Sequence, residues 1–172
     1  MLKNTIRTLV AVGSAVTATF AATGPARAAA DQVCYEAHVQ NVGWMGWQCD
    51  GAVGGTIGRS LNLESVRFKV NAGELCVKAY RSHYGWDSTF QCAKPSKTVQ
   101  IGTTGMNAPM EAILFYYRNG NGSYIKGKAH SRNIGWTDQY DTGTYRTGYS
   151  KMYMIGTTGR SLPMEALTMW WV

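Results

Sequence analysis

The same short pattern occurs three times in this chain, and this repetition constrains the fold more than any single residue does. A Gly-Trp pair follows an alanine that lies six residues before its glycine, and a Gly-Thr-x-Gly turn comes later in each copy. A glutamate stands eight residues beyond the threonine of each turn. The spacing inside each motif is constant while the segment between the motifs varies, which is typical of a repeated structural unit with variable loops. The three sets are Ala37, Gly43-Trp44, Gly55–Gly58 and Glu64; Ala79, Gly85-Trp86, Gly102–Gly105 and Glu111; and Ala129, Gly135-Trp136, Gly156–Gly159 and Glu165.

The N-terminal segment has the features of a secretory signal peptide. Lys3 and Arg7 form a basic start, and an uncharged, mostly small and apolar stretch of 17 residues runs from Thr8 to Gly24. Small residues then provide two cleavage sites, ending at Ala28 and Ala30. A membrane anchor is the alternative, but a spanning helix needs roughly 20 predominantly apolar residues. We therefore expect residues 1–30 to be a signal peptide and the mature chain to be secreted, with no membrane span.

Composition narrows the class of partner. The chain has 17 Lys and Arg against 10 Asp and Glu; Lys3, Arg7 and Arg27 leave with the leader, so 14 against 10 remain, a net charge of +4. The excess is spread along the chain, whereas nucleic-acid binders usually gather basic residues on one face. We expect no nucleic-acid partner. Residues 31–172 are long enough for a single domain with a sizeable core.

The cysteines follow the repetition. Cys34 and Cys76 each lie ten residues before the tryptophan of their motif, and Cys49 and Cys92 lie five and six residues after it. The third copy lacks both cysteines. Loss of the two together favours Cys34–Cys49 and Cys76–Cys92 disulfides among the three possible connectivities, and a secreted chain permits them. A zinc site is the alternative, but the tight Cys-x2-Cys spacing of such sites is missing.

The pattern of apolar residues predicts β-structure throughout. After each Gly-Thr turn, apolar and polar residues alternate with a period of two, which indicates a strand with one apolar face. The glutamate shares that face in all three copies. No window of twelve or more residues in the mature chain has a convincing helical period. The expected strands cover 33–42, 77–84 and 124–134, together with 64–70, 111–117 and 165–171.

Turn signals at 71–74 and 119–123 divide the mature chain into repeats of about 33–70, 75–118 and 124–172. Below, these are called the first, second and third repeat. A unit of this size cannot bury its apolar face alone. Closure of three copies around a pseudo-threefold axis would protect the sheet edges. We expect an all-β, pseudo-threefold domain of β-prism-like architecture, with a β-trefoil-like one as the alternative.

At this point the residues resemble a known family. The run Tyr35-Glu-Ala-His38-Val-Gln-Asn-Val-Gly43-Trp44, followed by Asp50-Gly51 and Leu63-Glu64-Ser65-Val66, is similar to the clostridial hydrophobic-W (ChW) repeat. The resemblance implies secretion by a Gram-positive bacterium, repeats in multiples of three, and binding to polysaccharide or protein at the cell surface. The second repeat departs from the pattern, with Tyr80 in place of His38. The family has no agreed catalytic residues, so the resemblance assigns none here.

Two groups of residues are candidates for the core and for a binding site. We expect Trp44, Trp86 and Trp136 to fill the core, because an indole buries a large area; stacking on sugar rings is the alternative. We expect Glu64, Glu111 and Glu165 to be half-buried acceptors for amides of the Gly-Thr turns. Loops on a rigid scaffold commonly carry binding. The ligand-binding candidates are therefore the loop aromatics Trp47, Phe90, Tyr140, Tyr145 and Tyr149, although loop aromatics also cover core edges without other function.

The histidines and glutamates do not show the sequence pattern of a catalytic or metal-binding site. His38 and His130 share a repeat position, but Tyr80 replaces the second copy and no metal-binding spacing accompanies them. A glycosidase needs two carboxylates in different environments, whereas repetition supplies three equal ones. We expect no catalysis, metal or cofactor. The predicted function is that of a secreted surface-binding domain for cell-wall or extracellular polysaccharide, and the alternative is a protein-interaction or structural module of the bacterial cell envelope.

Overall fold

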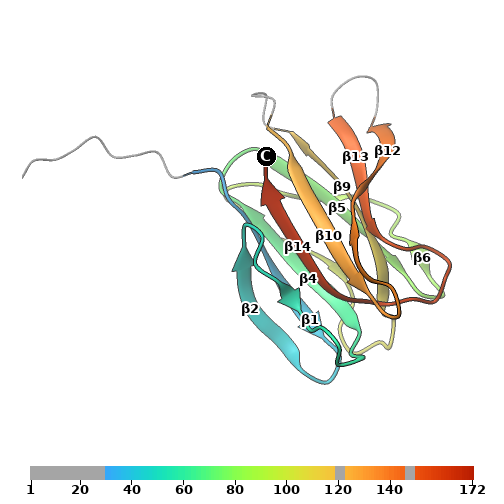
Figure 1. Cartoon of the computed structure of the whole chain (residues 1–172). Helices are drawn as coiled ribbons and strands as arrows, with labels where there is room; N and C mark the ends of the chain where they lie inside the picture. The colour runs from blue at the N-terminus through green and yellow to red at the C-terminus, as the bar shows by residue number, and fades with distance from the viewer. Residues whose placement is uncertain (1–29, 119–122, 146–149) are drawn as a thin grey trace, which may run out of the picture.

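The computed structural model describes residues 30–118, 123–145 and 150–172, and within these ranges the fold is built of β-strands and turns (Figure 1). The expected all-β class is confirmed. The predicted signal peptide lies outside the described residues except for Ala30, as does most of the predicted turn at 119–123. Over the described ranges, no helix is long and apolar enough to cross a membrane.

The strands form three antiparallel sheets, which we number by the repeat that supplies most of their strands. The first sheet has the order β2-β1-β4-β8, the second β12-β13-β9-β5-β6 with β7 also paired to β5, and the third β11-β10-β14-β3. The bounds are β1 (Val33–Val39), β2 (Gly43–Cys49), β3 (Gly54–Gly55), β4 (Leu63–Val70), β5 (Glu74–Arg81), β6 (Gly85–Trp86), β7 (Gln91–Ala93), β8 (Val99–Gly102), β9 (Met110–Arg118), β10 (Ile125–Ser131), β11 (Gly135–Asp138), β12 (Tyr140–Tyr145), β13 (Ser150–Gly156) and β14 (Met164–Trp171).

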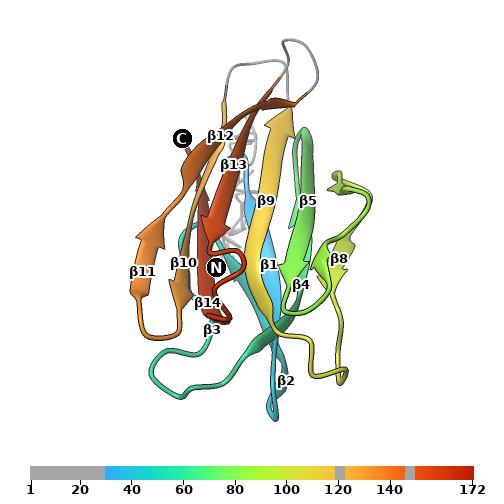
Figure 2. The same cartoon turned by 90° about the vertical axis from the view of Figure 1, so that its right-hand side faces the viewer.

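Each sheet contains at least one strand from another repeat: β8 in the first sheet, β13 with its hairpin partner β12 in the second, and β3 in the third. The strand that ends in the first glycine of the Gly-Thr turn leaves its own repeat: β8 pairs with β4, β13 with β9, and β3 with β14. Figure 2 shows one such exchange, with β13 of the third repeat beside β9 and β5 of the second. The threonine after the glycine extends each pairing by one bond to the carbonyl oxygen of the partner's glutamate, namely Thr103 N to Glu64 O (3.0 Å), Thr157 N to Glu111 O (2.8 Å) and Thr56 N to Glu165 O (2.9 Å).

The exchanged strands approach their neighbours so closely that glycine is required at the contact. A Cβ added to Gly102 would lie 2.3 Å from the carbonyl oxygen of Glu64, and one added to Gly156 would lie 2.2 Å from that of Glu111. Gly55 has the same relation to Glu165, at 2.4 Å. Their φ values of 75°, 87° and 111° are also ones that L-residues rarely adopt. The constant first glycine of the motif is thus explained by the joint between repeats.

The core lies between the sheets and is filled by the apolar faces of the predicted strands. Tyr35, Phe68 and Phe115 are among its largest fully buried side chains. On β4, Val66, Phe68 and Val70 are buried whereas Arg67 and Lys69 are not, so the expected alternation is present.

Both predicted disulfides are present. Cys34 and Cys49 are directly opposed on β1 and β2 with Cα atoms 4.1 Å apart, and Cys76 and Cys92 are opposed on β5 and β7 at 4.0 Å. The four cysteines therefore pair within the first and second repeats, as the sequence alignment of the repeats indicates.

Candidate functional site

The tryptophans of the repeated motif are not in the core, contrary to expectation. Each stands on an edge hairpin strand, and Trp44 and Trp86 are half-buried while Trp136 is 39% exposed. The reason is the register: Trp44 opposes His38, Trp86 opposes Tyr80, and Trp136 opposes His130, on the face of each hairpin away from the buried alanine that precedes that residue.

Each of these tryptophans packs against its cross-strand partner in the same way. The ring centroids of His38 and Trp44 lie 5.1 Å apart, with an interplanar angle of 74°. The Tyr80–Trp86 pair has 5.3 Å and 74°, and the His130–Trp136 pair has 5.4 Å and 77°. Edge-to-face aromatic pairs of this kind fix ring orientation. One partly exposed aromatic pair is therefore held at an equivalent position on each sheet.

Cations contact two of the three indoles. The guanidinium of Arg67 lies 3.9 Å from the centroid of Trp44, and the ammonium of Lys78 lies 5.4 Å from that of Trp86. Both distances are within the range of cation–π attraction. The third sheet has Thr168 opposite Lys128, where the first sheet has Arg67 opposite Glu36. Trp136 is the most exposed of the three rings.

The repeated glutamates are buried rather than half-buried, with exposed fractions of 6% for Glu64, 2% for Glu111 and 3% for Glu165. Turn amides do donate to two of them, but the turns belong to another repeat: Gly105 N reaches Glu64 Oε2 at 3.5 Å, and Arg160 N reaches Glu111 Oε2 at 3.3 Å. Strand exchange explains this, because it brings each Gly-Thr turn over the glutamate of a neighbouring repeat.

Histidine completes two of these junctions. Nδ1 of His38 lies 3.2 Å from Glu64 Oε2, and Nδ1 of His130 lies 3.2 Å from Glu165 Oε2. Both Nδ1 atoms are buried, and neither contact has hydrogen-bond geometry. The attraction therefore depends on the charge that the imidazole carries when it is protonated.

A pocket of about 560 Å³ opens at the junction of the first and second repeats. Its volume falls within the usual range of ligand pockets, roughly 300–1,000 Å³. The lining comes from both repeats and includes a carboxylate, an imidazole and amide and hydroxyl side chains: His38, Gln40, Asn41, Gly43, Glu64, Thr104, Gly105 and Asn107. Sequence reasoning missed this site, because the Thr104–Asn107 turn reaches Glu64 only through strand exchange.

Three of the five loop aromatics, Trp47, Phe90 and Tyr140, have described side chains. Trp47 is 36% exposed on β2 with the ammonium of Lys69 4.2 Å from its ring centroid. Phe90 packs edge-to-face on Tyr116, with centroids 5.0 Å apart, so it partly covers the second sheet. Tyr140 is 46% exposed on β12.

Tyr140 has a pocket of its own. This pocket is an open hollow of about 390 Å³, and its lining includes Asp138, Tyr140 and Arg160. Burial raises the pKa of the Tyr140 hydroxyl, and the charge of Arg160 opposes that rise only in part. Of the other two candidates, Tyr145 ends β12 and Tyr149 lies outside the described residues.

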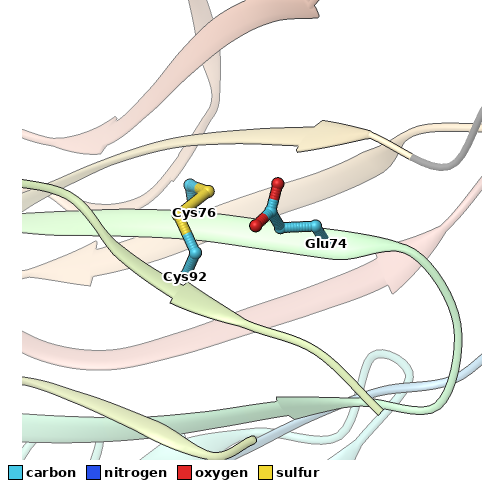
Figure 3. A group of neighbouring side chains, drawn as sticks. All are labelled: Glu74, Cys76 and Cys92. Carbon is cyan, nitrogen blue, oxygen red and sulfur yellow. A yellow bond between two sulfur atoms is a disulfide. The ribbon is translucent and has the colours of Figure 1, made fainter.

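A group of possible metal ligands, Glu74, Cys76 and Cys92, is accounted for by other bonds (Figure 3). The two sulfurs are joined to each other, so neither is a thiolate. Glu74 pairs with Arg118 and with Lys94, whose Nζ lies 3.1 Å from Oε1. Burial raises the pKa of the Glu74 carboxyl, but the two cations together lower it by more than burial raises it. The pKa of Glu74 therefore lies below its ordinary value. The group is a disulfide beside an ion-pair cluster.

The family match falls on the hairpin and strand just described. Residues 38–72 match the family model ChW, clostridial hydrophobic W. The ChW match begins at His38, includes the Gly43-Trp44 motif and Glu64, and ends after β4. Neither a curated protein nor a solved structure gives a significant match to the chain.

Proposed function

We propose that the chain is a secreted, non-catalytic domain that binds cell-wall or extracellular polysaccharide, and that all three of its repeats are ChW units closed in a β-prism-like, pseudo-threefold arrangement. The cyclic exchange of Gly-Thr strands supports the closure, since each repeat contributes its own Gly-Thr strand to a neighbouring sheet and receives another repeat's Gly-Thr strand in return. The equivalence of the three edge-to-face pairs supports a common unit.

The observation that carries the binding proposal is the position of the motif tryptophans. All three sheets hold a large indole partly exposed at the same place, so each indole leaves apolar area in contact with water. A purely structural role would favour burial of that area. Indoles offer a flat apolar face and one donor, which suits sugar rings. Trp136 is the best candidate platform, because its ring is the most exposed of the three.

The alternative, a protein-interaction module of the cell envelope, has one observation of its own. Arg67 over Trp44, Lys69 over Trp47 and Lys78 over Phe90 place cations on aromatic rings along two sheets. Such surfaces resemble the aromatic and arginine-rich centres of protein interfaces.

The test is sedimentation of the purified chain with insoluble cell-wall polysaccharide, before and after the wall fraction is stripped of protein by protease. The polysaccharide proposal requires that binding survives protease and falls at least about tenfold in Trp136→Ala. Trp171→Phe is the matched control, because Trp171 packs on Tyr117 with centroids 4.5 Å apart, outside the repeated motif. Binding that disappears after protease treatment supports the interaction module.

A further inference from the structure

The three junctions between repeats share one framework but are filled differently. We number each junction by the repeat that supplies its glutamate, so that the first contains Glu64, the second Glu111 and the third Glu165. Three residues before the glycine of each Gly-Trp pair, the chain carries Gln40, Ser82 or Arg132. Their backbone amides make equivalent bonds, to Asn62 O at 2.9 Å, to Pro109 O at 3.0 Å and to Pro163 O at 2.9 Å. These three side chains therefore start from equivalent places beside the buried glutamates.

In the third junction, an arginine of the chain occupies this place. Arg132 Nη2 donates to Ser60 O and to Asn62 Oδ1, both at 2.7 Å, and Nε lies 3.6 Å from Glu165 Oε1. The guanidinium thus binds the carboxylate, the turn of the first repeat and an amide together. It shows what kind of group this framework accommodates.

In the second junction, a hydroxyl and a larger ring take the place of the arginine. Ser82 Oγ donates to Glu111 Oε1 at 2.5 Å, and the backbone amide of Arg160 donates to Glu111 Oε2. Tyr80 stands where the other repeats have histidine, and its hydroxyl reaches within 3.9 Å of where a Cβ on Gly159 would lie. Glu111 is therefore satisfied by the chain itself.

The first junction has the 560 Å³ pocket instead. Gln40 brings no charge, and the ion-pair partner of Glu64 is His38, which is charged only when protonated. Glu165, by contrast, has the permanent charge of Arg132 in addition to His130. The pocket thus combines a buried carboxylate that lacks the third junction's guanidinium with amide and hydroxyl groups from Asn41, Thr104 and Asn107.

We propose that this pocket binds a hexosamine unit with a free ammonium group, with Glu64 as its counter-ion. A cation replaces the internal guanidinium of the third junction, and the surrounding amides and hydroxyl suit the sugar hydroxyls. Charge-assisted hydrogen bonds to a buried carboxylate are stronger than neutral ones. This inference rests on the proposed polysaccharide function and specifies the chemistry of one of its subsites. The net charge of +4 that remains without Lys3, Arg7 and Arg27 works against unspecific attraction to a polycation.

Three tetrasaccharides that differ only at C2 test the proposal by calorimetry at pH 7: the β-1,4-linked glucosamine, N-acetylglucosamine and glucose tetramers. We expect the glucosamine tetramer to bind at least about tenfold more tightly than the other two. Glu64→Gln should remove this preference. Glu165→Gln is the matched control and should keep it, because that carboxylate is already occupied by Arg132.

Exchange of the variable residue gives a second test that leaves Glu64 and Glu165 unaltered. Gln40→Arg should place a guanidinium in the first junction, as in the third, and abolish glucosamine binding while the melting temperature stays the same or rises. Arg132→Gln should open the third junction and raise the stoichiometry from one site to two.

Equal binding of all three tetramers, unchanged in Glu64→Gln, would overturn the ammonium site and leave the polysaccharide function standing. Binding of none of them, with the wall polysaccharide still sedimenting the chain, would overturn it as well. A third outcome is that an oligoarginine peptide binds in a Glu64-dependent way while the glucosamine tetramer does not bind. That result would identify the ligand of the pocket as a basic protein segment and refute the sugar assignment.

Discussion

Substitution of Gly102 by alanine is the sharpest test of the exchange between repeats. The new methyl group would lie 2.3 Å from the Glu64 carbonyl oxygen and 3.0 Å from the Ser65 Cα, so backbone must move against backbone. Its φ of 75° also costs an L-residue about 1–2 kcal/mol. Overpacking at a tight contact adds about 1–3 kcal/mol. Together these give a loss of about 2–5 kcal/mol in the free energy of unfolding.

Gly105, three residues later in the same turn, is the matched control. Its φ is 69°, and a Cβ there would meet no atom within 4 Å, so Gly105→Ala pays the conformational cost without the clash. For a domain of this size, 1 kcal/mol corresponds to about 2–4 °C in melting temperature. We expect a fall of about 10 °C for Gly102→Ala and about 3–5 °C for Gly105→Ala, measured by calorimetry. Equal losses in the two variants would refute the close approach of β8 to β4.

Three further predictions follow from named contacts. Reduction of the two disulfides should cost about 3 kcal/mol for each loop of this length, measured by urea unfolding with and without reductant; a Cys34–Cys76 peptide in a non-reducing map would contradict the pairing. Trp136→Ala should lower the free energy of unfolding by less than the roughly 3–5 kcal/mol of a buried aromatic truncation, because the ring is partly exposed. A larger loss would show that the ring belongs to the core. Burial raises the pKa of Tyr35, so the folded state favours the neutral phenol, and the stability it contributes is present below pH ~10 and lost as the pH rises further. Tyr35→Phe should flatten that alkaline decline in unfolding free energy, and an unchanged slope would contradict it.

Much of the local structure follows directly from the residues. Alternation along 64–70, 111–117 and 165–171 predicts β4, β9 and β14, because successive side chains of a strand point to opposite faces. The cysteine pairing also follows, since Cys34 and Cys76 share one repeat position and the third repeat lacks both cysteines of the pair. These features depend on short-range geometry, which the sequence carries.

The tryptophans show where this reasoning fails. Their size and constant position suggest a core role, yet cross-strand pairing with His38, Tyr80 and His130 puts them on the solvent side of their hairpins. Which face of a two-residue strand such as β6 is buried depends on the sheet beside it. Residue size alone does not contain that information.

The sequence by itself determined the repeats, the all-β class, the strands that carry the core and the disulfide pairs, because these depend on periodicity and fixed local spacing. Only the tertiary structure decided that each Gly-Thr strand joins another repeat's sheet, with β8 on β4, β13 on β9 and β3 on β14. It also decided that the junction at Glu64 has an open pocket while Arg132 fills the one at Glu165. The physical reason is that these contacts join residues about 40 to 110 positions apart, whose pairing depends on how the three sheets pack together.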